Sequence, residues 1–134
     1  MAEVLEKMWE VEEFLAFERA SEQKHELILG ELYPMSGVSF KYNRIAKNIL
    51  VLLENLFQNT QFETFGSDLR VANLIDNSFC YPDITVIAGE PIFIDKEFDT
   101  ITNPILIAEA LSVGTQQYDN EKKKGKKFDV YKEN

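Results

Sequence analysis

The spacing of apolar residues predicts two amphipathic helices, one near the N-terminus and one near the middle of the chain. Residues 10–23 and 41–58 carry apolar side chains at helical intervals, and Ser39 is placed to cap the second helix. The second helix has the clearer periodicity, with apolar residues Ile45, Ile49, Leu52, Leu53, Leu56 and Phe57. We expect this stripe to belong to the core and the helix to cover one face of a sheet.

The segments between and after these helices have the length and composition of strands. Residues 25–35 predict two strands joined by a tight turn or bulge near Gly30. Residues 62–74, with a break near Gly66, and residues 79–88 predict an antiparallel hairpin, because the polar run between them is typical of a turn.

The last third of the chain predicts a surface loop, a strand and a basic helix, over residues 89–103, 104–111 and 118–132. Together the segments indicate a single α/β (α+β) domain over residues 1–134. Its mixed sheet should have the hairpin and the 104–111 strand at the centre.

Two of the predicted strands carry a carboxylate where a buried strand should carry none. Because side chains alternate along a strand, Asp83 shares a face with Thr85, and Glu109 shares a face with Ile107. A buried carboxylate is costly unless it is paired, hydrogen-bonded or bound to a metal. The two carboxylates on neighbouring strands therefore suggest a site for a divalent cation.

Three other residues carry chemistry that has a simpler structural interpretation. His25 is the single histidine, and such a residue is more often hydrogen-bonded within the fold than a base or ligand. Cys80 is the single cysteine, which excludes an internal disulfide, and we expect it to be a small buried hydrophobe. Glu31 is either a carboxylate at the edge of the metal site or a solvent-facing strand residue.

The charge of the chain is unlike that of most DNA-binding proteins, except at its C-terminal end. The net charge is −9, but residues 121–134 hold six lysines against three acids. This basic patch either contacts phosphates or is a solvated helix face. No apolar run approaches the roughly 20 residues of a membrane span, so we expect a cytoplasmic location and no membrane partner.

Asp83, Glu109 and a lysine of the basic segment supply the residue types that phosphodiester cleavage needs. A metal ion generates the nucleophilic water, and Mg²⁺ usually takes one or two carboxylates. A nearby cation orients the water and offsets negative charge. Two carboxylates in strands occur in many proteins, so this pair alone does not identify a function. The order of short motifs along the whole chain is the more specific signal.

Five motifs follow one another over residues 10–131. They are His25-Glu26…Gly30-Glu31…Met35-Ser36-Gly37, Ser67-Asp68-Leu69-Arg70-Val71, Tyr81-Pro82-Asp83-Ile84, Pro104-Ile105-Leu106-Ile107-Ala108-Glu109-Ala110-Leu111-Ser112, and Thr115…Tyr118-Asp119…Lys127-Phe128…Tyr131. This order resembles the Uma-two family of restriction endonucleases. The resemblance implies the PD-(D/E)XK nuclease fold, a restriction-endonuclease-like mixed β-sheet flanked by helices.

The resemblance also implies roles for particular residues. The Pro-Asp motif falls on Asp83 and the strand glutamate on Glu109, which would bind Mg²⁺, or Mn²⁺ as a substitute. Lys127 matches the family's Lys-Phe-x-x-Tyr pattern and would position the attacking water. Lys123, about one helical turn away, is the alternative. Glu31 resembles the accessory acid near the N-terminus, and DNA is the implied substrate.

The chain departs from the family pattern in ways that keep a second hypothesis open. Ser112-Val113-Gly114-Thr115 replaces the usual Ser-Pro-Ser-Thr, and Tyr42 stands where the family has a histidine. The chain stops at Asn134, where the family continues, so we expect a truncated member with an open sheet edge that forms a homodimer. The alternative to an endonuclease is a catalytically inactive nuclease-fold relic or a protein-interaction module.

Overall fold

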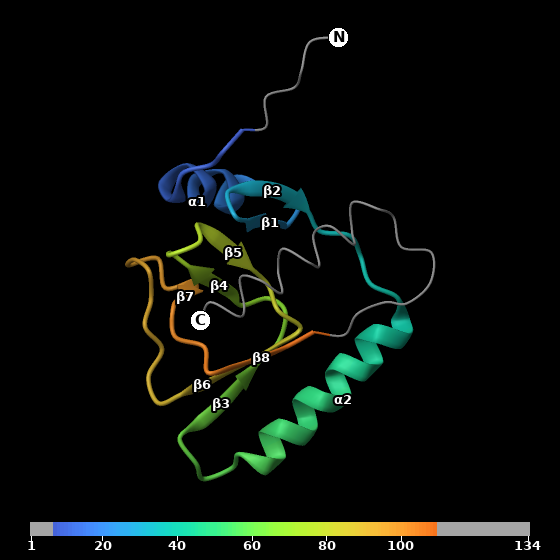
Figure 1. Ribbon diagram of the computed structural model, residues 1–134. Coiled ribbons are helices and arrows are strands. Elements are labelled where there is room, and N and C mark those ends of the chain that lie inside the picture. Colours follow the sequence, from blue (N-terminus) through green and yellow to red (C-terminus); the bar gives the residue numbers. More distant parts are fainter. Residues whose placement is uncertain (1–6, 110–134) are drawn as a thin grey trace. The chain divides into compact units, whose positions relative to one another are not determined.

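The computed structural model describes residues 7–109, which fall into two compact units (Figure 1). The first unit contains residues 7–36 and 73–80, and the second contains residues 37–72 and 81–109. The chain therefore leaves the first unit, returns to it briefly, and ends its described part in the second. The expectation of a single domain over residues 1–134 stays a prediction.

The first unit is a helix with three antiparallel strands. Helix α1 (Val11–Ala20) lies within the predicted segment and is followed by β1 (His25–Ile28) and β2 (Glu31–Pro34). β1 pairs with β2 on one side and with β5 (Ser78–Cys80) on the other. Phe14 of α1 stacks on Phe79 of β5, with ring centroids 4.9 Å apart, and both side chains are fully buried.

The turn between β1 and β2 confirms the prediction of a tight turn at Gly30. Leu29 and Gly30 both have positive φ angles, 51° and 82°, while Ile28 pairs directly with Glu31. Glycine adopts such angles without steric cost, and two successive positive φ angles match the twist of a two-residue hairpin. Cys80 packs against Ile28 in the core, so its predicted role as a buried hydrophobe is confirmed.

The second unit combines one long helix with two groups of strands. Helix α2 (Phe40–Leu56) precedes a three-stranded antiparallel sheet of order β3-β6-β8, formed by Phe62–Phe65, Ile84–Ala88 and Leu106–Ala108. Strand β4 (Arg70–Asn73), whose last residue belongs to the first unit, pairs in parallel with β7 (Thr100–Ile101). The mixed α+β class is therefore confirmed.

The predicted hairpin is right for half of its length and wrong for the rest. β3 ends at Phe65, next to the expected break at Gly66. It pairs with β6, which forms the second half of the strand predicted over residues 79–88, and Phe62 lies opposite Ala88. The remaining residues form the separate strands β4 and β5. Over the described residues β6 has the central place in its sheet and β8 an end place, which corrects the expectation for residues 104–111.

The predicted surface loop, residues 89–103, contains strand β7. Thr100 and Ile101 are both buried, and they pair with Arg70 and Val71 of β4. A strand of two residues is too short for alternation to reveal it, so the sequence prediction was wrong here. Ile101 joins Val71 and Ile87 in the main apolar cluster of this unit.

Helix α2 is amphipathic, but its predicted stripe is only partly covered. The helix begins after Ser39, whose hydroxyl accepts from the Tyr42 N–H as predicted, and it lies against β3 and β6 (Figure 1). No side chain of α2 is buried, and Leu52 and Leu56 are 66% and 68% exposed. The expectation that the stripe is core was therefore wrong for Ile45, Ile49, Leu52 and Leu56.

The cause is the rotation of the helix about its axis. Its half-buried side is centred on Leu50 and Leu53. A Cβ atom placed on Gly66, the residue after β3, would lie 3.9 Å from the Leu50 side chain. The apolar arc of α2 is wider than the side that meets the sheet. Neither helix in the described residues has both the length and the hydropathy to cross a membrane.

Candidate metal centre

Asp83 and Glu109 lie at the same end of the β6–β8 pair. The antiparallel register of these strands runs as far as Ile84 opposite Ala108. One more step along it brings Asp83 opposite Glu109. Residues directly opposite each other have Cβ atoms about 4.5–5.5 Å apart, and both carboxylates are half-buried. The structure therefore puts the two residues that the sequence singled out directly beyond the same end of two paired strands, β6 and β8.

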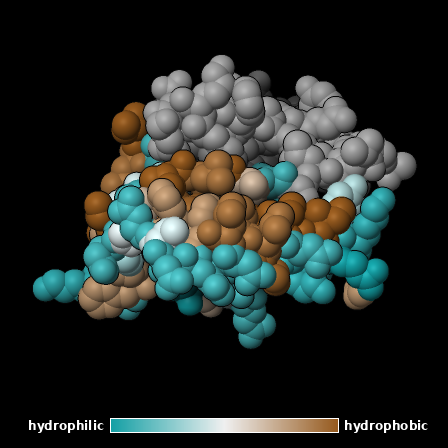
Figure 2. Space-filling view, turned by 90° about the horizontal axis from the view of Figure 1, so that it is seen from below, coloured by the Kyte–Doolittle hydropathy of each residue, from teal (hydrophilic) through white to brown (hydrophobic). Residues whose placement is uncertain are grey.

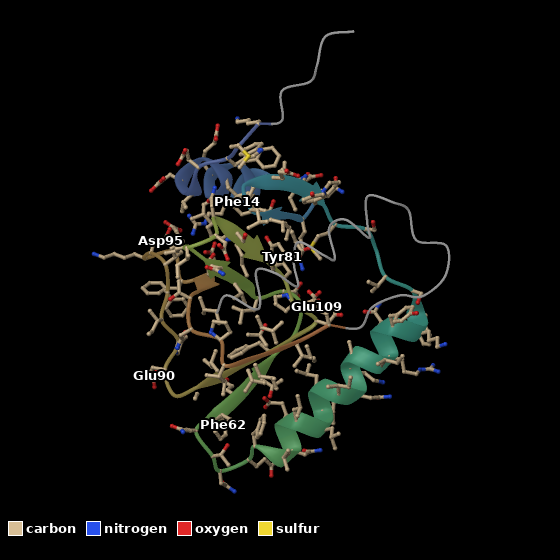
Figure 3. The ribbon with its side chains drawn as sticks, viewed as in Figure 1. Phe14, Phe62, Tyr81, Glu90, Asp95 and Glu109 are labelled. Carbon is tan, nitrogen blue, oxygen red and sulfur yellow. The ribbon has the colours of Figure 1, made fainter. Side chains whose placement is uncertain are left out.

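The carboxylates lie at one end of a face that also holds Thr85 and a group of apolar side chains. Ile87, Phe65 and Ile107 lie on this face and pack in the main cluster of the unit. Figure 3 labels Glu109 where β8 ends and Tyr81 just before β6 begins. The apolar neighbours lower the local dielectric on one side of the carboxylates, which strengthens their interaction with any cation.

A buried arginine holds the chain that leads into Asp83. Arg70 is 8% exposed, and its Nε donates to Tyr81 Oη at 3.0 Å. Its Nη1 donates to Thr100 Oγ1 at 3.0 Å and lies 3.2 Å from Asp99 Oδ2. Tyr81 is two residues before Asp83, so these bonds fix the start of β6. Sequence reasoning offered Asp68 or water as the partner of Arg70 and did not find Tyr81, Thr100 and Asp99, although an arginine within an apolar strand was a usable signal.

The donor set matches the preferences of Mg²⁺ or Mn²⁺. Within residues 7–109, no three or more His, Cys, Asp or Glu side chains gather into a metal-binding group. A carboxylate pair suits Mg²⁺, which usually keeps several waters and takes one or two carboxylates. Two like charges placed opposite each other destabilise a sheet, and a bound cation removes that repulsion.

The other predicted site residues are not brought to this pair within the described residues. Glu31 lies in β2, in the first unit, and its Oε2 accepts from Tyr33 Oη at 2.9 Å. Its role as an accessory acid stays a prediction. Lys127 and Lys123, with the predicted basic helix over residues 118–132, lie outside the described residues.

His25 is a structural residue, as predicted. Its Nδ1 lies 2.9 Å from Glu18 Oε1, and its backbone N–H donates to Glu18 Oε2 at 2.7 Å. Glu18 is buried although it lies on α1, and the His25 ring also contacts Phe17. Both oxygens of this carboxylate thus have donors within the first unit. Sequence reasoning missed Glu18, because its helix position alone does not show that it faces β1.

The described residues form a mixed α+β protein of two helices and short strands. The family model of Uma2, described as "Putative restriction endonuclease", matches residues 11–134. The match covers most of the chain, so this protein belongs to the Uma2 family.

Two proteins of one Synechocystis strain are similar to this chain in sequence. The chain is 39% identical over 120 residues to "Uncharacterized protein sll1609" of Synechocystis sp. (strain PCC 6803), covering 90% of this chain and 66% of that protein. It is 31% identical over 123 residues to "Uncharacterized protein slr1290" of the same organism, covering 92% and 62%. The chain thus spans just under two thirds of the length of these relatives.

A solved structure shows the same fold. A crystal structure from Anabaena variabilis, described as "a putative nuclease belonging to DUF820", superposes with a TM-score of 0.58 at 24% identity. The superposition covers 84% of this chain and 63% of the other.

Proposed function

We propose that this chain is the nuclease core of a metal-dependent endonuclease that hydrolyses phosphodiester bonds in DNA. The observation that carries the proposal is the β6–β8 register, which ends at Ile84 opposite Ala108 and which, extended by one residue, would set Asp83 opposite Glu109. Membership of a family described as restriction endonucleases and a fold neighbour described as a nuclease support it. Phosphate contacts would dominate binding, so affinity should fall steeply with salt.

The proposed roles follow the chemistry of each side chain. Asp83 and Glu109 hold Mg²⁺, and Mn²⁺ substitutes for it. The bound metal supplies a Lewis acid and a water of lowered pKa. Lys127, or Lys123 at the shorter spacing, orients the attacking water, and Glu31 acts as the accessory acid. Arg70 acts indirectly, because its bond to Tyr81 holds the segment that carries Asp83.

A plasmid-nicking assay tests the proposal. Supercoiled DNA should be cut with Mg²⁺ or Mn²⁺ and left intact with excess chelator. Asp83→Asn and Glu109→Gln should abolish cutting, since each removes one of the two charged metal ligands. Glu90→Gln is the matched control, because Glu90 is an exposed carboxylate in the same unit (Figure 3). Equal cutting by Asp83→Asn and the wild type would refute the site.

We further propose that the chain forms a homodimer, because α2 leaves an apolar stripe exposed. Ile45, Ile49, Leu52 and Leu56 recur at intervals of four, three and four residues, which places them on one side of the helix. Figure 2 shows apolar residues, in brown, forming a band on the side of the molecule seen from below. Exposed apolar patches of this kind often mark interaction sites.

Two measurements test the proposed homodimer. Light scattering at tens of micromolar should give a dimer, and Leu52→Glu should give a monomer. Val51→Glu, exposed but off the stripe, should leave the dimer intact.

The same experiments separate the endonuclease from the second candidate, a catalytically inactive interaction module. The exposed stripe on α2 is the observation that favours that candidate. A wild-type dimer that cuts no DNA under any metal condition would support it. A wild-type monomer that cuts DNA would refute it and would also refute the dimer.

A further inference from the structure

Two buried threonines in the β3-β6-β8 sheet carry hydroxyls with no hydrogen-bond partner over residues 7–109. They are Thr85, which is 0% exposed, and Thr64, which is 7% exposed. Leaving a buried hydroxyl unsatisfied costs about 1–3 kcal/mol. Native proteins hold few such groups, and a functional role is one of the recognised reasons for them.

Thr85 lies beside the carboxylate pair on the same face of the sheet. It is two residues from Asp83 along β6, and side chains two apart on a strand share a face. It pairs with Ile107, so it is diagonal to Glu109, at a Cβ separation of about 7–8 Å or less. A hydroxyl and one water span that gap.

The side chains that directly flank Thr85 on this face are apolar. Phe65 and Ile107 lie opposite it on the two adjacent strands, and Ile87 follows it along β6. None of these side chains can accept a hydrogen bond. Glu63, diagonal to Thr85 across β3, is exposed, so the half-buried carboxylates nearest to Thr85 on this face are those of Asp83 and Glu109.

Thr64 offers an internal comparison. It pairs with Val86, whose side chain points to the opposite face from Thr85. The two threonines therefore share residue type, burial and lack of a partner in the described residues, and they differ in which face of the sheet they occupy.

We infer that Thr85 is a positioning residue of the carboxylate pair. When a divalent cation is bound, its hydroxyl donates to the carboxylate of Asp83 or Glu109, directly or through one water. Hydrogen bonds of this kind fix the orientation of metal-binding carboxylates, and their loss usually weakens metal binding about 10- to 100-fold. The inference rests on the proposed function, because it needs the cation to bind at this pair.

Mn²⁺ titration followed by thermal unfolding of the full chain tests the inference. Thr85→Val replaces the hydroxyl by a methyl group of similar size. It should raise the metal-free melting temperature, because a buried polar group without a partner is removed, and should weaken Mn²⁺ binding about tenfold. Thr64→Val should raise the melting temperature too but leave the Kd for Mn²⁺ unchanged. Thr85→Ser keeps the hydroxyl and should bind Mn²⁺ nearly as well as the wild type.

Each outcome is decisive. Equal Mn²⁺ affinity in Thr85→Val and the wild type would overturn the role of Thr85 while leaving the metal site standing. A fall in metal-free stability in Thr85→Val would show that the hydroxyl already has a structural partner, which also overturns it. A wild-type protein that Mn²⁺ does not stabilise would overturn the proposed function and this inference together.

Discussion

The two units each contain a pair of titratable side chains, and the pairs have opposite character. In the first unit, both carboxylate oxygens of Glu18 receive hydrogen bonds, one from the His25 ring and one from its backbone. In the second unit, the register extended by one residue would set Asp83 opposite Glu109, one like charge against another. The first arrangement stabilises its unit without any ligand. The second suits a divalent cation, which would offset the two negative charges.

We expect this difference to separate structural carboxylates from metal-binding ones better than burial does. Glu18 is more buried than Asp83 or Glu109, and its environment supplies donors to both of its oxygens. Two neighbouring carboxylates suit a metal site, because the ion offsets their combined negative charge. Four measurements can break or sharpen this comparison.

The largest effect is expected from Glu18→Ala in the first unit. The change removes two hydrogen bonds and leaves the His25 ring and N–H buried without their acceptor, which should cost about 3 kcal/mol of unfolding free energy. Urea denaturation measures it. Glu12→Ala, exposed on the same helix, should change stability by less than about 0.5 kcal/mol. Similar small losses in both variants would show that the Glu18–His25 pair is not structural.

Arg70→Ala should come next, since Arg70 is a buried ion with protein partners, as Glu18 is. Its removal leaves Tyr81 Oη and Thr100 Oγ1 without their donor, at a cost of about 2 kcal/mol. Chemical denaturation of Arg70→Ala beside Lys47→Ala, an exposed cation in the same unit, measures the difference. Indistinguishable midpoints for the two variants would contradict the assigned role.

The metal-induced shift is expected to be smaller. At ten times its Kd, Mn²⁺ should stabilise the wild type by about 1.4 kcal/mol, from the linkage relation for a ligand that binds the native state alone. For a chain of this size that is a rise in melting temperature of about 5 °C. Glu109→Gln should abolish the rise and Glu90→Gln should keep it. A full shift in Glu109→Gln would place the ion elsewhere.

The smallest effect concerns the like charges themselves. In metal-free buffer Asp83→Asn should raise the unfolding free energy by about 0.5 kcal/mol, because directly opposed like charges destabilise a strand pair. The gain should shrink in 1 M salt, where the screening length falls to about 3 Å. Calorimetry at low and high salt measures both. A clear loss of stability would mean that the interactions Asp83 already makes outweigh its repulsion from Glu109.

The carboxylate site was proposed from the sequence by a local rule and stays a prediction. Alternation along a strand predicts Asp83 beside Thr85 and Glu109 beside Ile107, and the structure puts both carboxylates directly beyond the strand ends. The Gly30 turn and the Ser39 cap were predicted for the same reason, since each depends on a few adjacent residues. The nature of Thr85 as a buried hydroxyl without a partner was not predicted, because it depends on residues of three strands.

Errors arose where distant segments decide the outcome. The rotation of α2 against β3 and β6 left Ile49 and Leu52 outside, although their spacing is that of a core stripe. Strand β7 forms because it pairs in parallel with β4, and a segment of two residues is too short to show the apolar alternation that predicts a strand. Arg70 is buried because Tyr81 and Thr100 come to it from other strands.

The sequence by itself therefore determined the residue types, their faces and the order of the motifs that define the family. The tertiary structure alone decided the β6–β8 register, which turns two separate carboxylates into an opposed pair. The reason is that alternation repeats every two residues and specifies a face, whereas register depends on the neighbouring strand, on turns and on packing. A shift of the β6–β8 register by two residues would leave each side chain on the same face of the sheet, but Asp83 and Glu109 would no longer be at opposed positions.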